Sequence, residues 1–172
     1  MRAFARFDGL KLFALWIVSF IFYVAGFSTP SLGMLAVLLA FITPYLVTRL
    51  LRQYRDNGLD GIISFGRGWA YIIFLFFYAS LLFAACQFIY FSFIDKGYFA
   101  SAVSDMFNNP ENSQAIKILG MGNSMEEGLK QFCEMRPIDR VLNILTSNLM
   151  IGVFLGLPSA MLCKRSGVEK VK

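Results

Sequence analysis

Four long apolar stretches dominate the chain and limit what it can fold into. They cover Leu10–Phe27, Leu32–Leu51, Trp69–Ile94 and Val141–Cys163. A helix needs about 20 mostly apolar residues to cross the ~30 Å hydrocarbon core of a bilayer, and each stretch approaches or exceeds that length. The sequence therefore predicts an all-α, polytopic membrane protein. We expect residues 1–172 to form a single domain with four transmembrane helices.

The first two stretches are separated by only Ser28, Thr29, Pro30 and Ser31. A proline among small polar residues favours a turn over a continued helix, so the two spans should form a tight antiparallel hairpin. The basic start and first apolar run also fit a cleaved signal peptide. A second span that follows after only a turn favours a retained transmembrane helix.

The distribution of Lys and Arg predicts the orientation. Residues 1–11, the 49–68 loop and residues 164–172 carry eleven Lys or Arg against four Asp or Glu, whereas segment 95–140 carries five against seven. Because short cytoplasmic segments are enriched in Lys and Arg, both termini should be cytoplasmic (N-in, C-in). Segment 95–140 should be extracytoplasmic, and the protein should lie in a bacterial inner membrane.

The 95–140 segment is too long for a structureless turn and should be partly helical. Ser124 to Glu127 fit a capping box that would start a short amphipathic helix. A weaker helical pattern covers Gln114–Leu119, and Asn108-Asn109-Pro110 should break the chain before it.

Several chemistries are excluded by residue content. The chain has no histidine, so it cannot use an imidazole as base or metal ligand. Its three cysteines, Cys86, Cys133 and Cys163, are too far apart for a zinc motif. Only Cys133 falls in the extracytoplasmic segment, where it is either a buried free thiol or part of an intermolecular disulfide. We expect no enzyme activity, no catalytic residues, no metal, no cofactor and no nucleic-acid partner.

A basic stripe follows the second span. Arg49, Arg52 and Arg55 recur every three residues, so a continuing helix would present them on one side, and Arg67 precedes the third span. Such arginines can bind lipid phosphates, or they can simply mark the cytoplasmic side. We therefore take these four arginines as candidate lipid-phosphate ligands.

Uncharged polar residues and small residues mark the spans. Amides such as Gln87 and Asn143 usually form interhelical hydrogen bonds, although they can also line a substrate path. On the fourth span, small or polar residues recur every four positions and predict a helix-packing surface that faces either another span or a second subunit. The strip consists of Asn148, Gly152, Gly156 and Ala160.

The order of these parts resembles a family of small four-span bacterial membrane proteins known only as a domain of unknown function. The resemblance rests on Tyr54-Arg55-Asp56-Asn57 and on Ile63-Ser64-Phe65-Gly66-Arg67-Gly68 within the basic loop. It implies a four-helix inner-membrane protein without established catalytic residues. It also implies a role beside lipid-linked sugar chemistry, with a polyprenyl-phosphate glycosyltransferase as a candidate partner.

Two functional hypotheses follow. The first is a non-enzymatic accessory or scaffolding protein that packs on a membrane partner or on a second copy of itself, and that supports lipid-linked envelope glycan chemistry. The alternative is a binder or carrier of an anionic or polyprenyl-phosphate lipid. Both hypotheses place the protein in contact with membrane lipids.

Overall fold

The computed structural model describes residues 1–109, 127–128, 130–132 and 134–165. Within them, four helices are long and apolar enough to cross a membrane. The first and second are α1 (Arg2–Gly26) and α2 (Pro30–Gly58). The third is α3 (Phe65–Ile89), which continues as the π-helix η1 (Tyr90–Ile94), and the fourth is α7 (Pro137–Cys163). The prediction of an all-helical, multi-pass membrane protein is confirmed.

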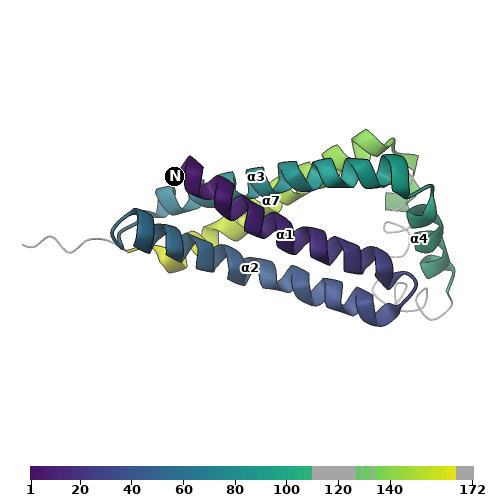
Figure 1. Ribbon diagram of the computed structural model, residues 1–172, viewed down its shortest axis with the longest axis horizontal. Coiled ribbons are helices and arrows are strands. Elements are labelled where there is room, and N and C mark those ends of the chain that lie inside the picture. The colour runs from purple at the N-terminus through teal and green to yellow at the C-terminus, as the bar shows by residue number, and fades with distance from the viewer. Residues whose placement is uncertain (110–126, 129, 133, 166–172) are drawn as a thin grey trace, which may run out of the picture.

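The four helices run side by side along the long axis of the molecule (Figure 1). At one end, α1 begins, α2 ends, α3 begins and α7 ends. This end carries the arginines that the sequence singles out, and we call it the arginine end. At the other end, a short helix, α4 (Tyr98–Asn108), crosses beside the tips of the long helices. We call this the α4 end.

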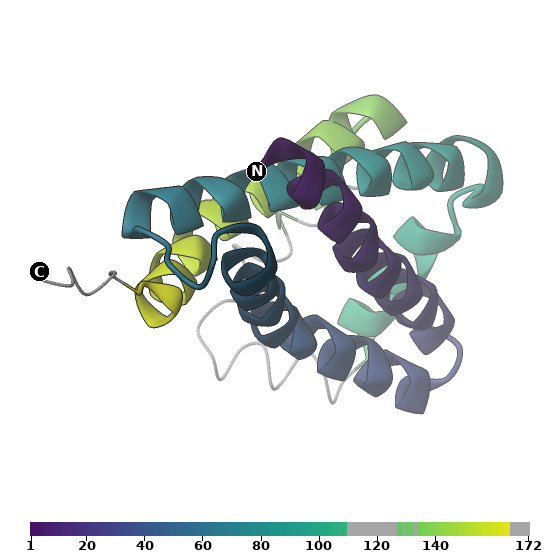
Figure 2. The same cartoon turned by 60° about the vertical axis from the view of Figure 1, so that its left-hand side comes forward.

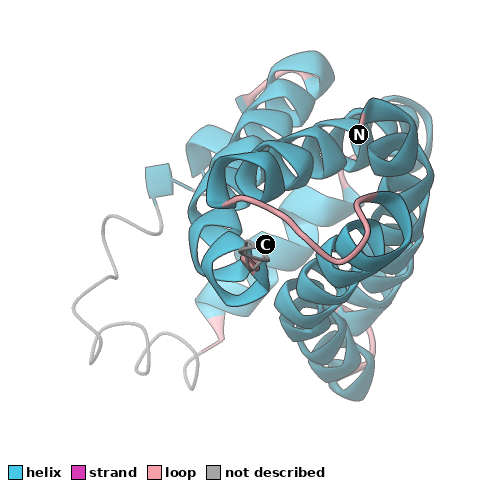
Figure 3. Ribbon diagram, turned by 90° about the vertical axis from the view of Figure 1, so that its left-hand side faces the viewer, coloured by secondary structure: helices cyan, strands magenta, loops and turns pink. Residues whose placement is uncertain are grey.

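Tight turns connect the helices. Glycines meet in the α1–α2 hairpin, where a Cβ on Gly26 would lie 2.5 Å from the Cα of Gly33. The α2–α3 loop, seen face-on in Figure 3, turns through Asp60 and Gly61, both with positive φ. The Ser64 side chain then accepts a hydrogen bond from the Arg67 N–H and caps α3.

The helices extend beyond the predicted spans. α1 begins at Arg2 rather than near residue 10, and α2 ends at Gly58 rather than near residue 51. Arginine, lysine and glutamine have good helix propensity, so a helix does not end where its hydrophobic stretch does. The predicted amphipathic segment is helical at its described residues 127–128, 130–132 and 134, whereas the weaker one at 114–119 lies outside the described residues.

The sequence analysis missed α4 entirely. This helix begins after Gly97, whose φ is 88°, and the Asp95 carboxylate accepts a hydrogen bond from the Phe99 N–H. It ends at Asn108, the first residue of the Asn108-Asn109-Pro110 sequence that was expected to break the chain. Eleven residues without a long apolar run do not stand out beside four membrane spans.

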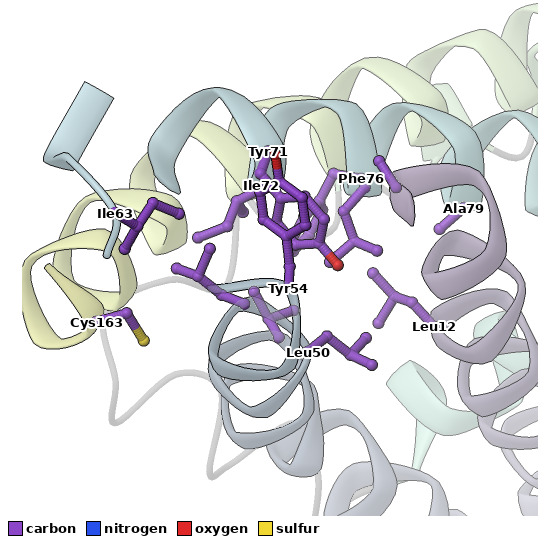
Figure 4. Close-up of a cluster of buried hydrophobic side chains, with 13 residues drawn as sticks. Leu12, Leu50, Tyr54, Ile63, Tyr71, Ile72, Phe76, Ala79 and Cys163 are labelled. Atoms are coloured by element: carbon purple, nitrogen blue, oxygen red, sulfur yellow. The ribbon is translucent and has the colours of Figure 1, made fainter. Parts of the chain in front are cut away.

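Two apolar clusters fill the bundle. The cluster at the arginine end joins all four long helices around Tyr54, Tyr71 and Phe76, as Figure 4 shows. Here the rings of Tyr54 and Tyr71 stack with their centroids 4.5 Å apart. The cluster at the α4 end is built from edge-to-face contacts among Phe27, Phe91 and other aromatic rings.

Candidate lipid-binding groove

A groove of about 450 Å³ lies between the four long helices, in their membrane-spanning part. It begins near the middle of α2 and runs toward the α4 end. Each helix contributes mainly apolar or aromatic side chains, among them Phe20 of α1, Phe41 of α2 and Phe83 of α3. From α7 come Ile151 and the amide of Asn148. The groove is therefore an apolar site with few polar groups.

The groove exists because α7 packs closely on α3 but meets α2 only near the arginine end. A Cβ on Gly152 would lie 2.5 Å from Cγ of Phe76, and one on Gly156 would lie 2.9 Å from Cδ1 of Trp69. The indole N–H of Trp69 also donates to the Val153 carbonyl at 3.1 Å. The small residues of α7 thus face another helix of the same chain, where Ala160 is also buried.

Contacts between α2 and α7 lie close to the arginine end. The hydroxyls of Thr48 and Ser159 are 3.1 Å apart, and Arg55 donates to the Cys163 carbonyl at 3.2 Å. From there the two helices diverge toward the α4 end (Figures 1 and 2). The groove lies in the angle between them.

Hydrogen bonds in the groove walls join α1 to α2. The indole N–H of Trp16 donates to Thr43 Oγ1 at 3.2 Å, and the Ser19 hydroxyl donates to the Ala36 carbonyl at 2.9 Å. Within the described part of the chain, Asn148 has no such partner. Its half-buried amide is thus a polar group that the groove can offer to a ligand.

The four candidate arginines differ in their contacts and in their exposure. Arg55 forms a two-pronged ion pair with Asp56, with contacts of 2.7 and 3.1 Å, besides its bond to α7. Arg49 and Arg52 are exposed on α2, and Arg67 is exposed in the first turn of α3. Arg55 is therefore a structural residue, whereas Arg49 and Arg52 remain available to a phosphate.

An exposed strip connects these two arginines to the groove. Phe41, Tyr45, Arg49 and Arg52 follow one another at intervals of four, four and three residues, so they lie on one side of α2. Phe41 lines the groove, and both aromatic side chains are about 70% exposed. The strip runs from the apolar site to the basic surface.

The other polar residues that the sequence singled out lie elsewhere. Gln87 is 3% exposed, and its Oε1 has no hydrogen-bond partner among the described residues, whereas Asn143 is exposed on α7. Cys133 lies outside the described residues. In the part of the chain that the structure describes, acidic and cysteine side chains do not gather into a group that could hold a metal ion.

Sequence reasoning missed a buried polar cluster at the arginine end. Asp8 of α1 is only 6% exposed, and its carboxylate accepts hydrogen bonds from the Tyr71 hydroxyl of α3 and from the Lys11 ammonium. In the prediction of the orientation, Asp8 and Lys11 were counted only as charges at the N-terminal end of the first span. The available signal was their spacing of three residues, which allows an ion pair on a helix.

Comparison with known proteins identifies the family. No curated protein and no solved structure matches the chain. The sequence pattern of one family matches residues 8–165, which include all four long helices except residues 2–7 of α1. The expected resemblance is confirmed: the chain belongs to the family described as "Protein of unknown function (DUF4199)".

Proposed function

We propose that this protein is a non-enzymatic protein of the bacterial inner membrane that binds a phosphate-bearing lipid, with the hydrocarbon chain of that lipid in the groove. One observation carries the proposal. The groove lies in the membrane-spanning part between two helices that diverge (Figure 1), and its lining includes the exposed side chains of Val37, Phe41 and Ile151. We therefore place its mouth toward the bilayer core. Hydrocarbon chains are the ligands that can enter from that side.

The size and lining of the groove suit such a chain. Its volume of about 450 Å³ falls in the range of about 300–1,000 Å³ that is usual for small-molecule sites. Aromatic side chains such as Phe20 and Phe83 offer rigid apolar surface at low entropic cost. A lipid chain in the groove also fills space that the diverging helices leave unpacked.

The strip on α2 supports a phosphate head group. A lipid in the leaflet of the arginine end could place its phosphate at Arg49 and Arg52 and pass its chain over Tyr45 and Phe41 into the groove. Arginine binds phosphate through charge-assisted hydrogen bonds, which are about twice as strong as neutral ones. A polyprenyl phosphate is one lipid of this kind.

Filling the groove tests the chain site. Tagged protein would be purified in mild detergent, and its lipids and proteins would be measured by mass spectrometry. We expect Ala40→Trp, which adds an indole inside the groove, to reduce the bound lipid about tenfold, as a loss of about 1.4 kcal/mol in binding would. Leu38→Trp, on the lipid-facing side of the same helix, is the control. Equal lipid in both variants would refute the groove as the binding site.

Charge removal tests the phosphate site. The double variant Arg49→Gln with Arg52→Gln should lose anionic lipid selectively. The matched control, Arg6→Gln with Lys164→Gln, removes the same charge from exposed positions on α1 and just after α7, at residues that are not candidate phosphate ligands. If both double variants lose lipid equally, the arginines act only through the overall surface charge.

The accessory-subunit hypothesis is tested in the same purification. The small-residue strip of α7 is covered by α3, so a partner would have to pack on another face. A stoichiometric membrane protein, such as a polyprenyl-phosphate glycosyltransferase, or a second copy of the chain would support this second role. Co-purified lipid without protein would favour the lipid-binding role alone.

We further propose that the arginine end faces the cytoplasm. Its excess of Lys and Arg supports this orientation. A fluorescent protein fused after residue 172 should then fluoresce in bacterial cells, and alkaline phosphatase inserted after Asn109 should be active. The reverse pattern would overturn the orientation.

A further inference from the structure

A second cavity, of about 280 Å³, lies between α1 and α2 at the arginine end. Phe4, Phe7, Asp8 and Lys11 line it from α1, and Gln53, Tyr54 and Asn57 line it from α2. None of these residues lines the groove, which lies on the side of α2 that faces α7. The two sites are therefore separate.

One wall of this cavity is a hydrogen-bond acceptor. Asp8 is buried, with Oδ2 bonded to the Tyr71 hydroxyl and Oδ1 bonded to Lys11 Nζ at 2.7 Å. An ionised carboxylate has about four lone-pair positions, so roughly two are left for a ligand. A buried charge at the edge of a membrane span is expensive and commonly marks a functional site.

Hydrogen-bond donors lie beside Asp8 on α1 and across the cavity on α2. The Lys11 side chain is 57% exposed, and its ammonium has two N–H groups beyond the one that Asp8 accepts. Gln53 and Asn57 lie one turn apart on α2, and their amides form no hydrogen bond within the described part of the chain. The Asp8–Lys11 pair is neutral overall, so the cavity presents a dipole rather than a net charge.

We propose that this cavity binds an aminophosphate ester, the head-group chemistry of an ethanolamine phospholipid. The ligand ammonium would donate to Asp8, and the phosphate would accept from Lys11 and the two amides. An anionic head group without an ammonium would form no ion pair with Asp8, and a quaternary ammonium has no N–H to donate to it. Phe4 and Phe7 are 43% and 70% exposed at the rim, which suits an entrance that touches acyl chains.

Native mass spectrometry of the full chain can test this selectivity. Detergent-purified protein would be titrated with phosphatidylethanolamine, phosphatidylcholine and phosphatidylglycerol of identical acyl chains. We expect the ethanolamine lipid to bind about tenfold more tightly than either of the others, as one charge-assisted hydrogen bond would provide. Competition by soluble phosphoethanolamine would identify a free aminophosphate as a second source of the ligand. Equal binding of phosphatidylglycerol or phosphatidylcholine would overturn the proposal.

Two variants locate the effect. Asp8→Asn keeps the shape and an acceptor for Tyr71, and it should abolish the preference for ethanolamine over choline. Asn57→Trp fills the cavity from an exposed position and should abolish the same preference, while Asn143→Trp, on exposed α7 surface, should retain it. If Asp8→Asn does not fold, Asn57→Trp decides alone, and a retained preference in that variant refutes the site. Ala40→Trp should leave the preference intact, so this proposal and the groove fail independently.

Discussion

The two ends of the bundle are closed by different kinds of contact. At the arginine end, buried polar groups connect the helices: Asp8 bonds to Tyr71, Thr48 meets Ser159, and Arg55 bonds to the α7 backbone. At the α4 end, Phe27, Phe91, Phe99 and their neighbours form edge-to-face contacts. The hydrogen bonds at the arginine end need a defined distance and angle. The aromatic contacts at the α4 end tolerate small displacements.

This difference shows how one bundle can be both fixed and able to admit a ligand. The polar contacts hold α2 against α7 at the arginine end, and the aromatic cluster closes the α4 end beside the divergent helices. Between them lies the groove. We therefore expect substitutions near the arginine end to affect stability more than equivalent substitutions near the α4 end.

The largest loss of stability should come from a substitution at the α3–α7 contact, on which the comparison of the two ends depends. Gly152→Leu places a side chain where Cγ of Phe76 lies 2.5 Å from the new Cβ, so the helices must separate. Overpacking costs about 1–3 kcal/mol, and the rigid Phe76 ring places this site near the upper value. The thermal midpoint in detergent should fall sharply. Gly66→Leu is the control, because a Cβ there meets nothing within 4 Å.

The next largest loss of stability should come from the buried polar cluster around Asp8. Tyr71→Phe removes the hydroxyl that donates to Asp8 and leaves the buried carboxylate with Lys11 as its remaining hydrogen-bond partner in the described part of the chain. A hydrogen bond to a charged group contributes about 1.5–3 kcal/mol, so we expect a loss of about 2 kcal/mol in unfolding free energy. Denaturant or thermal unfolding in a defined micelle measures it. An unchanged midpoint would show that water or lipid replaces the hydroxyl.

A smaller loss should distinguish Arg55 from its neighbours. Arg55→Gln breaks the bond to the Cys163 carbonyl and the ion pair with Asp56. Because Asp56 is half exposed, the ion pair adds little, and we expect a loss of about 1 kcal/mol. Arg49→Gln, which has no such contacts in the described structure, should leave the thermal midpoint unchanged and reduce lipid binding instead. The reverse result would mean that Arg55 is a ligand residue.

The sequence predicted the features that depend on composition and on the spacing of residues along a helix. Long apolar runs specify four spans, and the four-residue spacing of Gly152 and Gly156 specifies a packing face. It could not identify the face of α3 that is buried, because aromatic residues such as Tyr71, Phe76 and Phe77 surround that helix. Tyr71 and Phe76 are fully buried, whereas Phe77 is 45% exposed. The position and full lining of the groove, and the Asp8 cluster, could not be predicted because both depend on interhelical angles.

The smallest loss of stability should come from a second Tyr-to-Phe substitution, this time at the α4 end. Tyr98→Phe removes a hydroxyl that lies 2.9 Å from Ser28 Oγ and connects α4 to the α1–α2 turn. Both groups are exposed, so water replaces the lost partner, and the loss should be below about 0.5 kcal/mol. Both variants remove the same hydroxyl group, so a comparison with Tyr71→Phe under identical conditions measures the effect of burial alone. If Tyr98→Phe were as destabilising as Tyr71→Phe, the α4 end would be held by directional hydrogen bonds too. The groove would then be closed at both ends by fixed contacts, and it could not widen by separation of α2 from α7.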